Sequence, residues 1–258
     1  MRLMKRILSA AAVLALSASL LVGCSSGTAS SVPVSASSAA ESTVSSVEET
    51  ASSAVDENAA AAAQLLNDLT GSYQELWPVI LADEYKQTWL DDCTALVGED
   101  NAEAAFEKLS SMVTGDVYGE DAVKAYANGG GAYFCGFTNS LAILTFDGET
   151  STISGTDKDG NVLFSHTYHY IGMEPVRGLY EFQSDDADSG EFTYFFLAPD
   201  TSAETYHIEF RYGSDAEALS QYDTGEYAYW LASGISTDCD QTMIDNCIEL
   251  FCTENLAG

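Results

Sequence analysis

An Ala-rich stretch from Asp56 to Leu69 begins the regular pattern of hydrophobic positions along the chain. Its acidic start and its end at Thr70-Gly71 are typical of the two ends of a helix. Apolar residues continue beyond it at spacings of three and four, which is the period of an amphipathic helix. They predict three further helical segments: residues 75–97 with an interruption at Pro78, a segment from Asn101, and residues 120–127.

The pattern changes to short alternating runs after Gly129-Gly130-Gly131. These runs are rich in aromatic and β-branched residues, and turn-forming residues separate them. They predict strands over residues 132–138, 140–146, 151–155, 162–171, 178–183, 192–197 and 205–212. Two more helices are expected, over 215–221 and 240–251. So many closely spaced short strands favour a small antiparallel barrel or sandwich over a parallel sheet.

The first 55 residues predict export and anchoring. Arg2, Lys5 and Arg6 precede an apolar run over residues 7–22, which is typical of a signal peptide. The run ends in Leu-Val-Gly-Cys and resembles a bacterial lipobox, so residues 1–23 would be removed and Cys24 would carry lipid. An ordinary signal peptide with a nearby cysteine is the alternative. The Ser- and Ala-rich residues 24–55 are expected to be a disordered tether, and residues 56–258 the folded domain.

The charge balance is strongly acidic, with 40 Asp and Glu residues against nine Lys and Arg residues and a formal net charge of −31. Such a field repels nucleic acid and anionic membrane surfaces, so we expect membrane contact through the lipid alone. It attracts cations, although an acidic surface that only maintains solubility is an equal alternative. The predicted location is the cell envelope, outside the cytoplasm.

The chemistry-bearing residues give no sign of an enzyme. No nucleophile-elbow, phosphate-loop or His-Glu-x-x-His motif occurs. Five cysteines remain after Cys24, with no Cys-x-x-Cys pair, so no zinc knuckle is indicated and at least one thiol stays unpaired within the chain. Their pairing is left open by the sequence: Cys93, Cys135, Cys239, Cys247 and Cys252. Cys247 has the helical spacing of a core residue.

Several short sequence segments resemble the ZinT (YodA) family, whose domain is also the C-terminal domain of some zinc-uptake solute-binding lipoproteins. They are LTGSYQELWPVIL over residues 69–81, TYHYIG over 167–172, YHIEFRYG over 206–213 with AEAL over 216–219, and ASGIS over 232–236 with QTMI over 241–244. The resemblance covers residues 66–254, with extra sequence between Cys93 and Tyr118. It implies a lipocalin-like (calycin-type) barrel with N-terminal and C-terminal helices. It also implies zinc binding outside the cytoplasm, with a metal-uptake transporter or its solute-binding protein as partner.

The resemblance also implies where zinc would bind. The family holds zinc with three histidines, which map to Thr205, His207 and Phe196, so only His207 is retained. Residues two apart in a strand share a face, which places Glu209 beside His207. If that face lines the barrel interior, as in the family, Glu209 is a second ligand and Arg211 its counter-charge.

A third ligand is sought on the strand over residues 162–171. Alternation places His166 on one face with Tyr168 and Tyr170, and His169 on the other, so His166 is the preferred partner of His207. The predicted function is therefore zinc binding in support of uptake, through a degenerate site of His207, Glu209 and His166. The alternative is a decayed site, in a barrel that binds a small apolar ligand or an envelope protein without metal. Weak calcium binding at Asp185-Asp186-Ala187-Asp188 is a lesser possibility.

Overall fold

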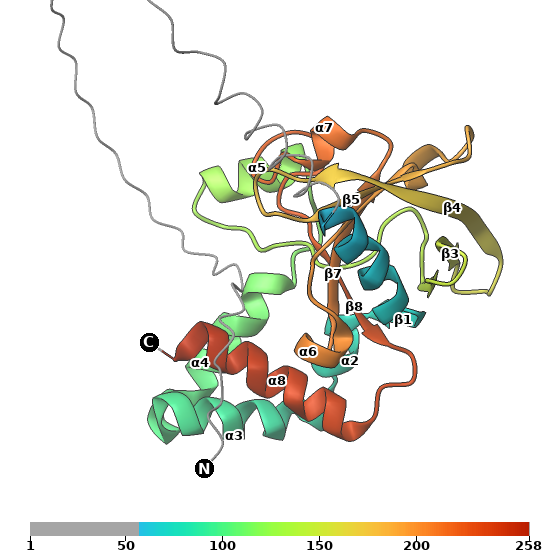
Figure 1. Ribbon diagram of the computed structural model, residues 1–258. Helices are drawn as coiled ribbons and strands as arrows, with labels where there is room; N and C mark the ends of the chain where they lie inside the picture. Colours follow the sequence, from blue (N-terminus) through green and yellow to red (C-terminus); the bar gives the residue numbers. More distant parts are fainter. Residues whose placement is uncertain (1–56, 258) are drawn as a thin grey trace, which may run out of the picture. The chain divides into compact units, whose positions relative to one another are not determined.

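The computed structural model describes residues 57–257, and their β-strands form one closed barrel (Figure 1). Each strand is antiparallel to the next, and β8 pairs with β1 to close the wall. The strands are β1 (Gly71–Glu75), β2 (Ile143–Asp147), β3 (Thr152–Thr156), β4 (Val162–Met173), β5 (Tyr180–Ser184), β6 (Tyr194–Leu197), β7 (Ile208–Gly213) and β8 (Ala232–Ser236). The predicted fold class, an antiparallel barrel with accessory helices, is confirmed.

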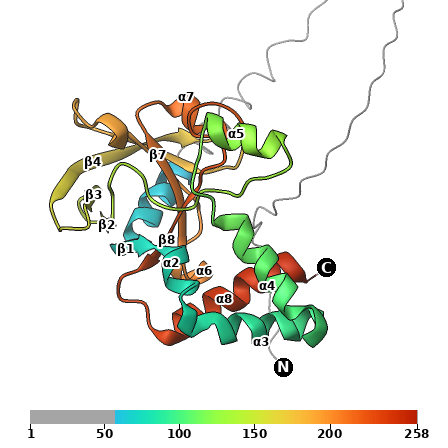
Figure 2. The ribbon, with the colours of Figure 1, turned by 180° about the vertical axis from the view of Figure 1, so that it is seen from behind.

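The helices gather at two ends of the barrel. The order along the chain is a helix over residues 57–68, then α2 (Leu76–Ile80), α3 (Lys86–Val97), α4 (Glu99–Val113), α5 (Glu120–Ala127), α6 (Ser202–Thr205), α7 (Ala216–Leu219) and α8 (Gln241–Leu256). Helices α3, α4 and α8 lie together at one end, and α5 and α7 lie at the other (Figures 1 and 2). Asp215 and Asp240 cap the starts of α7 and α8 by accepting backbone N–H bonds.

The barrel interior is filled by aromatic side chains. Phe195 is fully buried, and its ring centroid lies 5.3 Å from that of Tyr212 and 6.4 Å from that of Phe210. Phe164 stacks on Phe192 with centroids 3.9 Å apart. Close-packed rings leave little room for a ligand among them. The barrel interior is therefore an aromatic core.

A second core lies between the helices and the outer wall of the barrel. Trp89 of α3 is fully buried and donates its indole N–H to the Ile80 carbonyl at 2.7 Å. The outward side chain of Ile235 on β8 belongs to the same cluster as Ile248 on α8. This core fixes α8 against the barrel wall, which matters for the side chains that α8 carries.

The sequence missed two strands and predicted one that does not form. β1 lies just before the predicted helix over 75–97 and overlaps it only at Glu75, and its five residues are too few to display a period of two. β8 is rich in small residues and is buried on both faces, so it lacks alternation. Residues 132–138 do not form a strand and make only isolated β-bridges at Phe134. The Phe134 N–H donates a hydrogen bond to the Tyr229 carbonyl at 2.9 Å. That segment runs across the barrel end and adds no strand to the wall.

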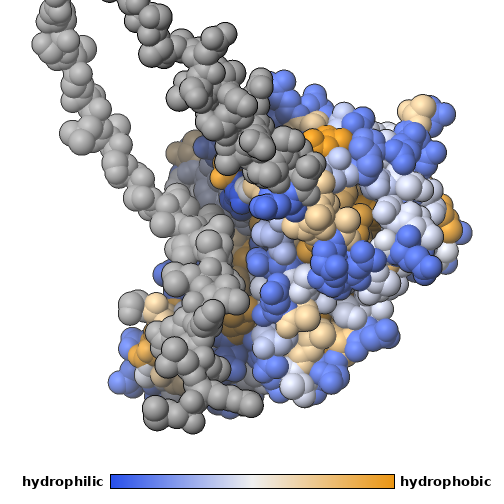
Figure 3. Space-filling view, viewed as in Figure 1, coloured by the Kyte–Doolittle hydropathy of each residue, from blue (hydrophilic) through white to orange (hydrophobic). Residues whose placement is uncertain are grey.

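The predictions about the signal peptide, lipid-modified Cys24 and tether fall outside the described residues. Within residues 57–257, no helix has both the length and the apolar character required to cross a membrane. Figure 3 shows hydrophilic side chains interspersed with small apolar patches on the face it presents.

We predict that Phe195→Ala lowers the free energy of unfolding by about 3–5 kcal/mol, because it opens a cavity among stacked rings. Val162→Ala, at a side chain that is 70% exposed, is the matched control and should change it by less than about 0.5 kcal/mol. Urea unfolding followed by circular dichroism measures both. Equal effects of the two substitutions would show that the barrel interior is not the main core.

Candidate metal site

The wall strand β7 alternates between the aromatic interior and the outer surface. Ile208, Phe210 and Tyr212 are buried in the interior cluster. Residues between them point the other way, so Glu209 faces outward beside β8. His207, just before β7, also lies outside the barrel, where its ring meets Cys247 of α8. The expectation that His207 lines the barrel interior is wrong, because apolar residues occupy the inward positions of this strand.

A turn between α6 and β7 sets the orientation of His207. Thr205 ends α6, and Tyr206 has a left-handed backbone with φ of 66°, so Thr205 and His207 do not share a strand face as predicted. The His207 Nδ1 lies 2.7 Å from the Thr205 carbonyl oxygen. A carbonyl only accepts, so Nδ1 carries the proton and donates. In the neutral ring, Nε2 then keeps its lone pair for a proton or a metal ion.

Glu209 is the group that Nε2 faces. The Nε2 and Oε1 atoms are 3.9 Å apart, and the two side chains are 18% and 44% exposed. That separation is too long for a direct hydrogen bond. Zinc bonds of about 2.0–2.1 Å to nitrogen and oxygen place two ligand atoms about 3.4 Å apart at a tetrahedral angle, and farther apart at wider angles. A small closing movement would therefore allow both atoms to contact one ion.

Further donor groups surround this pair. The Cys247 sulfur lies 3.8 Å from His207 Nδ1, on the side away from Glu209. Asp200 and Glu254 lie close enough to feel the charges of both members of the pair. Partial burial is the main cause that raises the pKa of each carboxyl; neighbouring carboxylates raise it further, and the His207 charge lowers it.

His207 and Glu209 shift each other's protonation. Burial opposes charge on the His207 ring, but the contacts with Cys247 and Glu209 outweigh it and raise the pKa of His207 well above its ordinary value. Burial likewise opposes charge on Glu209, and the His207 contact outweighs it and lowers the pKa of Glu209, with Arg177 adding a smaller effect in the same direction. The pair therefore favours the imidazolium–carboxylate form when no metal is bound.

The third predicted ligand lies elsewhere. His166 does share the predicted face with Tyr168 and Tyr170, as the burial pattern of β4 shows. Its Nδ1, however, donates to the Asp186 carboxylate at 2.7 Å, and His169 donates to Asp185 at 2.6 Å. The acidic turn over residues 185–188 thus holds the two β4 histidines. The expectation that His166 joins His207 is wrong, because His166 is held by Asp186 whereas His207 lies outside the barrel beside Cys247 of α8.

Arg211 is not the counter-charge of Glu209. Its guanidinium is buried, donates to the backbone carbonyls of Leu219, Gln221 and Tyr227, and lies 4.4 Å from the centre of the Tyr222 ring. It fixes the segment after α7 to the outer wall of β7. The cation that acts on Glu209 is Arg177, a residue that the sequence pattern did not single out.

The residues present do not fit a three-histidine zinc site. Phe196 and Thr205 supply no imidazole, and within residues 57–257 no group of three or more His, Cys, Asp or Glu side chains is already arranged around one point. The structure instead offers one imidazole and one carboxylate facing each other, with two more carboxylates nearby. Cys247 and Glu254 are seven positions apart on α8, which places them on one helix face; that spacing was the available sequence signal.

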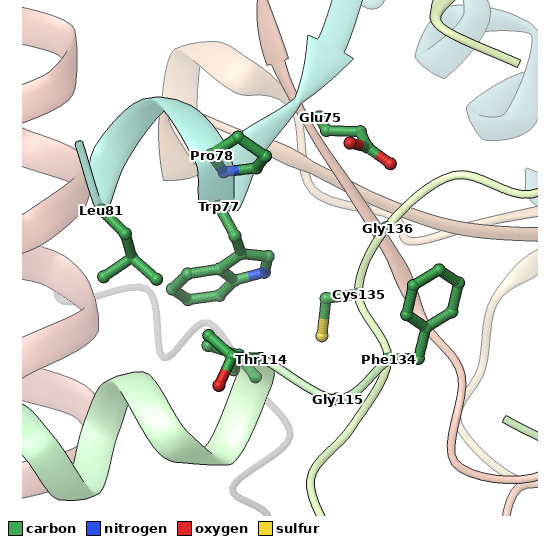
Figure 4. A pocket seen from close by; sticks show the side chains of 10 residues that line it. Glu75, Trp77, Pro78, Leu81, Thr114, Gly115, Phe134, Cys135 and Gly136 are labelled. Atoms are coloured by element: carbon green, nitrogen blue, oxygen red, sulfur yellow. The ribbon is translucent and has the colours of Figure 1, made fainter. Parts of the chain in front are cut away.

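A separate cavity of ≈ 330 Å³ lies between α2 and the two segments around residues 113–115 and 134–136 (Figure 4). Trp77, Pro78, Leu81, Val113 and Phe134 give it mostly apolar walls. The buried indole N–H of Trp77 has no hydrogen-bond acceptor. No pattern in the sequence indicated this cavity.

The comparisons with known proteins give similarity in structure alone. No protein-family model matches the chain, and no curated protein matches it in sequence. The Zn(II)-bound ZinT-like domain of Streptococcus pneumoniae AdcA is similar over 72% of this chain and 89% of that chain, with 15% identity and a TM-score of 0.45. Zn(II)-bound AdcA from the same organism is similar over 70% of this chain but only 34% of its own length, with 14% identity and a TM-score of 0.42.

We predict that the His207 ring titrates with a midpoint above about 6.5, the ordinary value, and that Glu209→Gln lowers this midpoint. A raised pKa in the folded state contributes stability that is complete below about pH 6.5 and is lost as the pH rises through the folded pKa. At low pH this stability is lost again, as the pH falls through the lowered pKa of Glu209 and its carboxylate is protonated. NMR titration of the three histidine rings measures the midpoints, with Asp188→Asn on another turn as control. A midpoint at or below 6.5, or no response to Glu209→Gln, would contradict this electrostatic description.

Proposed function

We propose that this domain captures a divalent metal ion, zinc foremost, on the outer wall of the barrel between β7 and α8. His207 Nε2 and the Glu209 carboxylate are the first two ligands, and Asp200 and Glu254 are the nearest groups able to complete the shell. The observation that carries the proposal is the 3.9 Å separation of Nε2 and Oε1, with Nδ1 fixed by the Thr205 carbonyl.

The chemistry of these donors suits reversible capture better than permanent storage. A structural zinc site surrounds the ion with four protein ligands. Here only two groups face each other, one of them partly open to water, and carboxylates at the rim must move inward. An ion held in this way is bound more weakly and is released more easily, which is what a carrier requires.

Some charges around the site favour the binding of a cation, and others oppose it. The acidic surface raises the local concentration of cations. The Arg177 guanidinium near Glu209, and the proton that His207 retains near neutral pH, both oppose a second positive charge. Metal binding must displace that proton, so its affinity rises as the pH rises through the pKa of His207.

Delivery is the remaining part of the proposal. With Cys24 lipidated and residues 24–55 acting as a tether, the domain would be held at the outer surface of the membrane and would transfer zinc to a metal-uptake transporter or its solute-binding protein. The prediction that the chain is not an enzyme belongs to the same proposal.

The cavity beside α2 supports a second candidate function, the capture of a small ligand with an apolar body. Its mostly apolar walls suit a small ring, whereas the barrel interior is already filled with side chains. Phenol is a suitable probe, because it is a small, mostly apolar ring. Protection of the cavity residues in NMR titration with phenol, lost in Val113→Trp, would favour this function over metal capture; unchanged spectra up to millimolar phenol would remove it.

For the proposed function, we predict that zinc raises the melting temperature of the full chain and that His207→Ala reduces the zinc affinity at least tenfold, because it removes the only nitrogen ligand. Glu209→Gln should reduce it as well. The matched controls are His169→Ala and Glu217→Gln, which remove an imidazole and an exposed carboxylate elsewhere. Isothermal titration calorimetry gives the affinities, and a melting shift provides a second readout.

Two outcomes would overturn this proposal. One is a zinc affinity that His207→Ala and His169→Ala reduce equally, which would indicate diffuse binding to the acidic surface. The other is no heat and no melting shift with zinc between pH 6 and 8 for the unmodified chain. Loss of binding only on removal of Asp185 and Asp186 would move the site to the β4 histidines.

A further inference from the structure

Two cysteines from distant parts of the chain meet in the core between the helices and the barrel. Cys93 lies in α3 and Cys252 in α8, and both are fully buried. Their sulfur atoms are 3.9 Å apart. The two helices pack directly against each other, and both residues belong to the same apolar cluster as Trp89 and Ile248. The fold therefore brings together one pair of thiols that are 159 positions apart.

The other three cysteines have different neighbours. Cys247 contacts the His207 ring at 3.8 Å, and the Cys135 sulfur lies 3.9 Å from the Tyr133 carbonyl oxygen. Cys239 is partly exposed in the loop before α8. An odd number of thiols must leave at least one unpaired within the chain. The contact geometry singles out Cys93 and Cys252 as partners.

We propose that Cys93 and Cys252 form a disulfide that ties α3 to α8 in the exported protein. A disulfide bond is about 2.05 Å long, so the sulfurs must approach by roughly 2 Å. Rotation about the two Cα–Cβ bonds, with a small adjustment of the packed helices, supplies this movement. The proposal rests on the predicted export of the chain, because an oxidising compartment allows such bonds to persist. It does not depend on metal binding.

The chemical step is a thiol–disulfide exchange. An external disulfide, such as that of a thiol oxidoreductase or oxidised glutathione, accepts two electrons and becomes two thiols. The Cys93 and Cys252 S–H bonds break, one S–S bond forms between the two sulfurs, and the two protons pass to the thiols formed from the external disulfide. Burial raises the pKa of both thiols, so the exchange takes place while α8 is still undocked during folding. Once the core has closed, the same burial shields the bond from reductants.

The bond would also fix the candidate metal site. Cys252 lies on α8 between Cys247, which contacts His207, and Glu254, which lies near the pair. Anchoring this part of α8 to α3 holds those two side chains against β7. The disulfide is thus a positioning element for the outer-wall site as well as a staple of the fold.

The test is peptide mapping of the full chain after refolding in a glutathione redox buffer, with free thiols alkylated in denaturant before any reduction. We expect a single cross-linked peptide pair that contains Cys93 and Cys252, while Cys135, Cys239 and Cys247 are alkylated. Reduction should lower the melting temperature by about 5 °C or more. Cys239→Ser is the matched control and should leave the cross-linked pair and the melting temperature unchanged.

Three results would overturn the disulfide: alkylation of both Cys93 and Cys252 in the unreduced chain, a cross-link that joins either of them to another cysteine, or a melting temperature that reduction leaves unchanged. The Cys93→Ala/Cys252→Ala double variant, which keeps both positions apolar, serves as a second reference. Its melting temperature should not respond to reductant. Zinc titration of the oxidised chain is a separate readout, so failure of metal binding leaves the disulfide result unaffected.

Discussion

The alternation of residues along β7 is the constraint on which the rest of the structure depends. Ile208, Phe210 and Tyr212 enter the barrel, where they pack against the rings of neighbouring strands. The side-chain period of a strand is two, so the polar residues between them have only the outer face available. A shift by one position would exchange an aromatic core for a charged one. The packed interior therefore determines where His207 and Glu209 lie.

The helices turn that outer face into a partly enclosed site. α8 packs on the barrel through Ile244 and Ile248, and the same helix brings Cys247 to the His207 ring. Removal from water then makes the charges of the site interact more strongly than they would at an open surface. Helix α8 thus contributes both to the stability of the fold and to the candidate site. The core under α8 holds the fold together, and its edge carries the donors around the His207–Glu209 pair.

The barrel could be predicted from the sequence because most of its strands repeat aromatic and β-branched residues with clear turns between them. β8 was not predicted because Ala232, Ser233 and Gly234 are small and buried on both faces, so they show no alternation of hydrophobic and polar residues. The relative position of His207, Glu209 and the β4 histidines on their own strands followed from a period of two. The sequence did not show which face of β7 points into the barrel, since the aromatic and the polar residues of this strand both form regular series.

Local sequence patterns could not predict which distant residues lie close together. Cys93 and Cys252 meet only because α3 and α8 pack on each other, and Asp200 approaches Glu254 only because the loop before α6 passes near the end of α8. The resemblance to the ZinT family supplied the expectation of a metal site facing the barrel interior, and strand alternation added His166 to it as the third ligand. There the structure has the buried Phe195 and Phe210 instead.

The central claim is that metal capture takes place on the outer wall, beside His207 and away from the barrel interior. A crystal structure of the zinc-loaded chain, with anomalous scattering recorded on both sides of the zinc absorption edge, tests it most directly. The account predicts one strong anomalous peak at bonding distance from His207 Nε2 and a Glu209 oxygen, between β7 and α8. A peak inside the barrel, or one bound to His166 or His169 with none at His207, would contradict it.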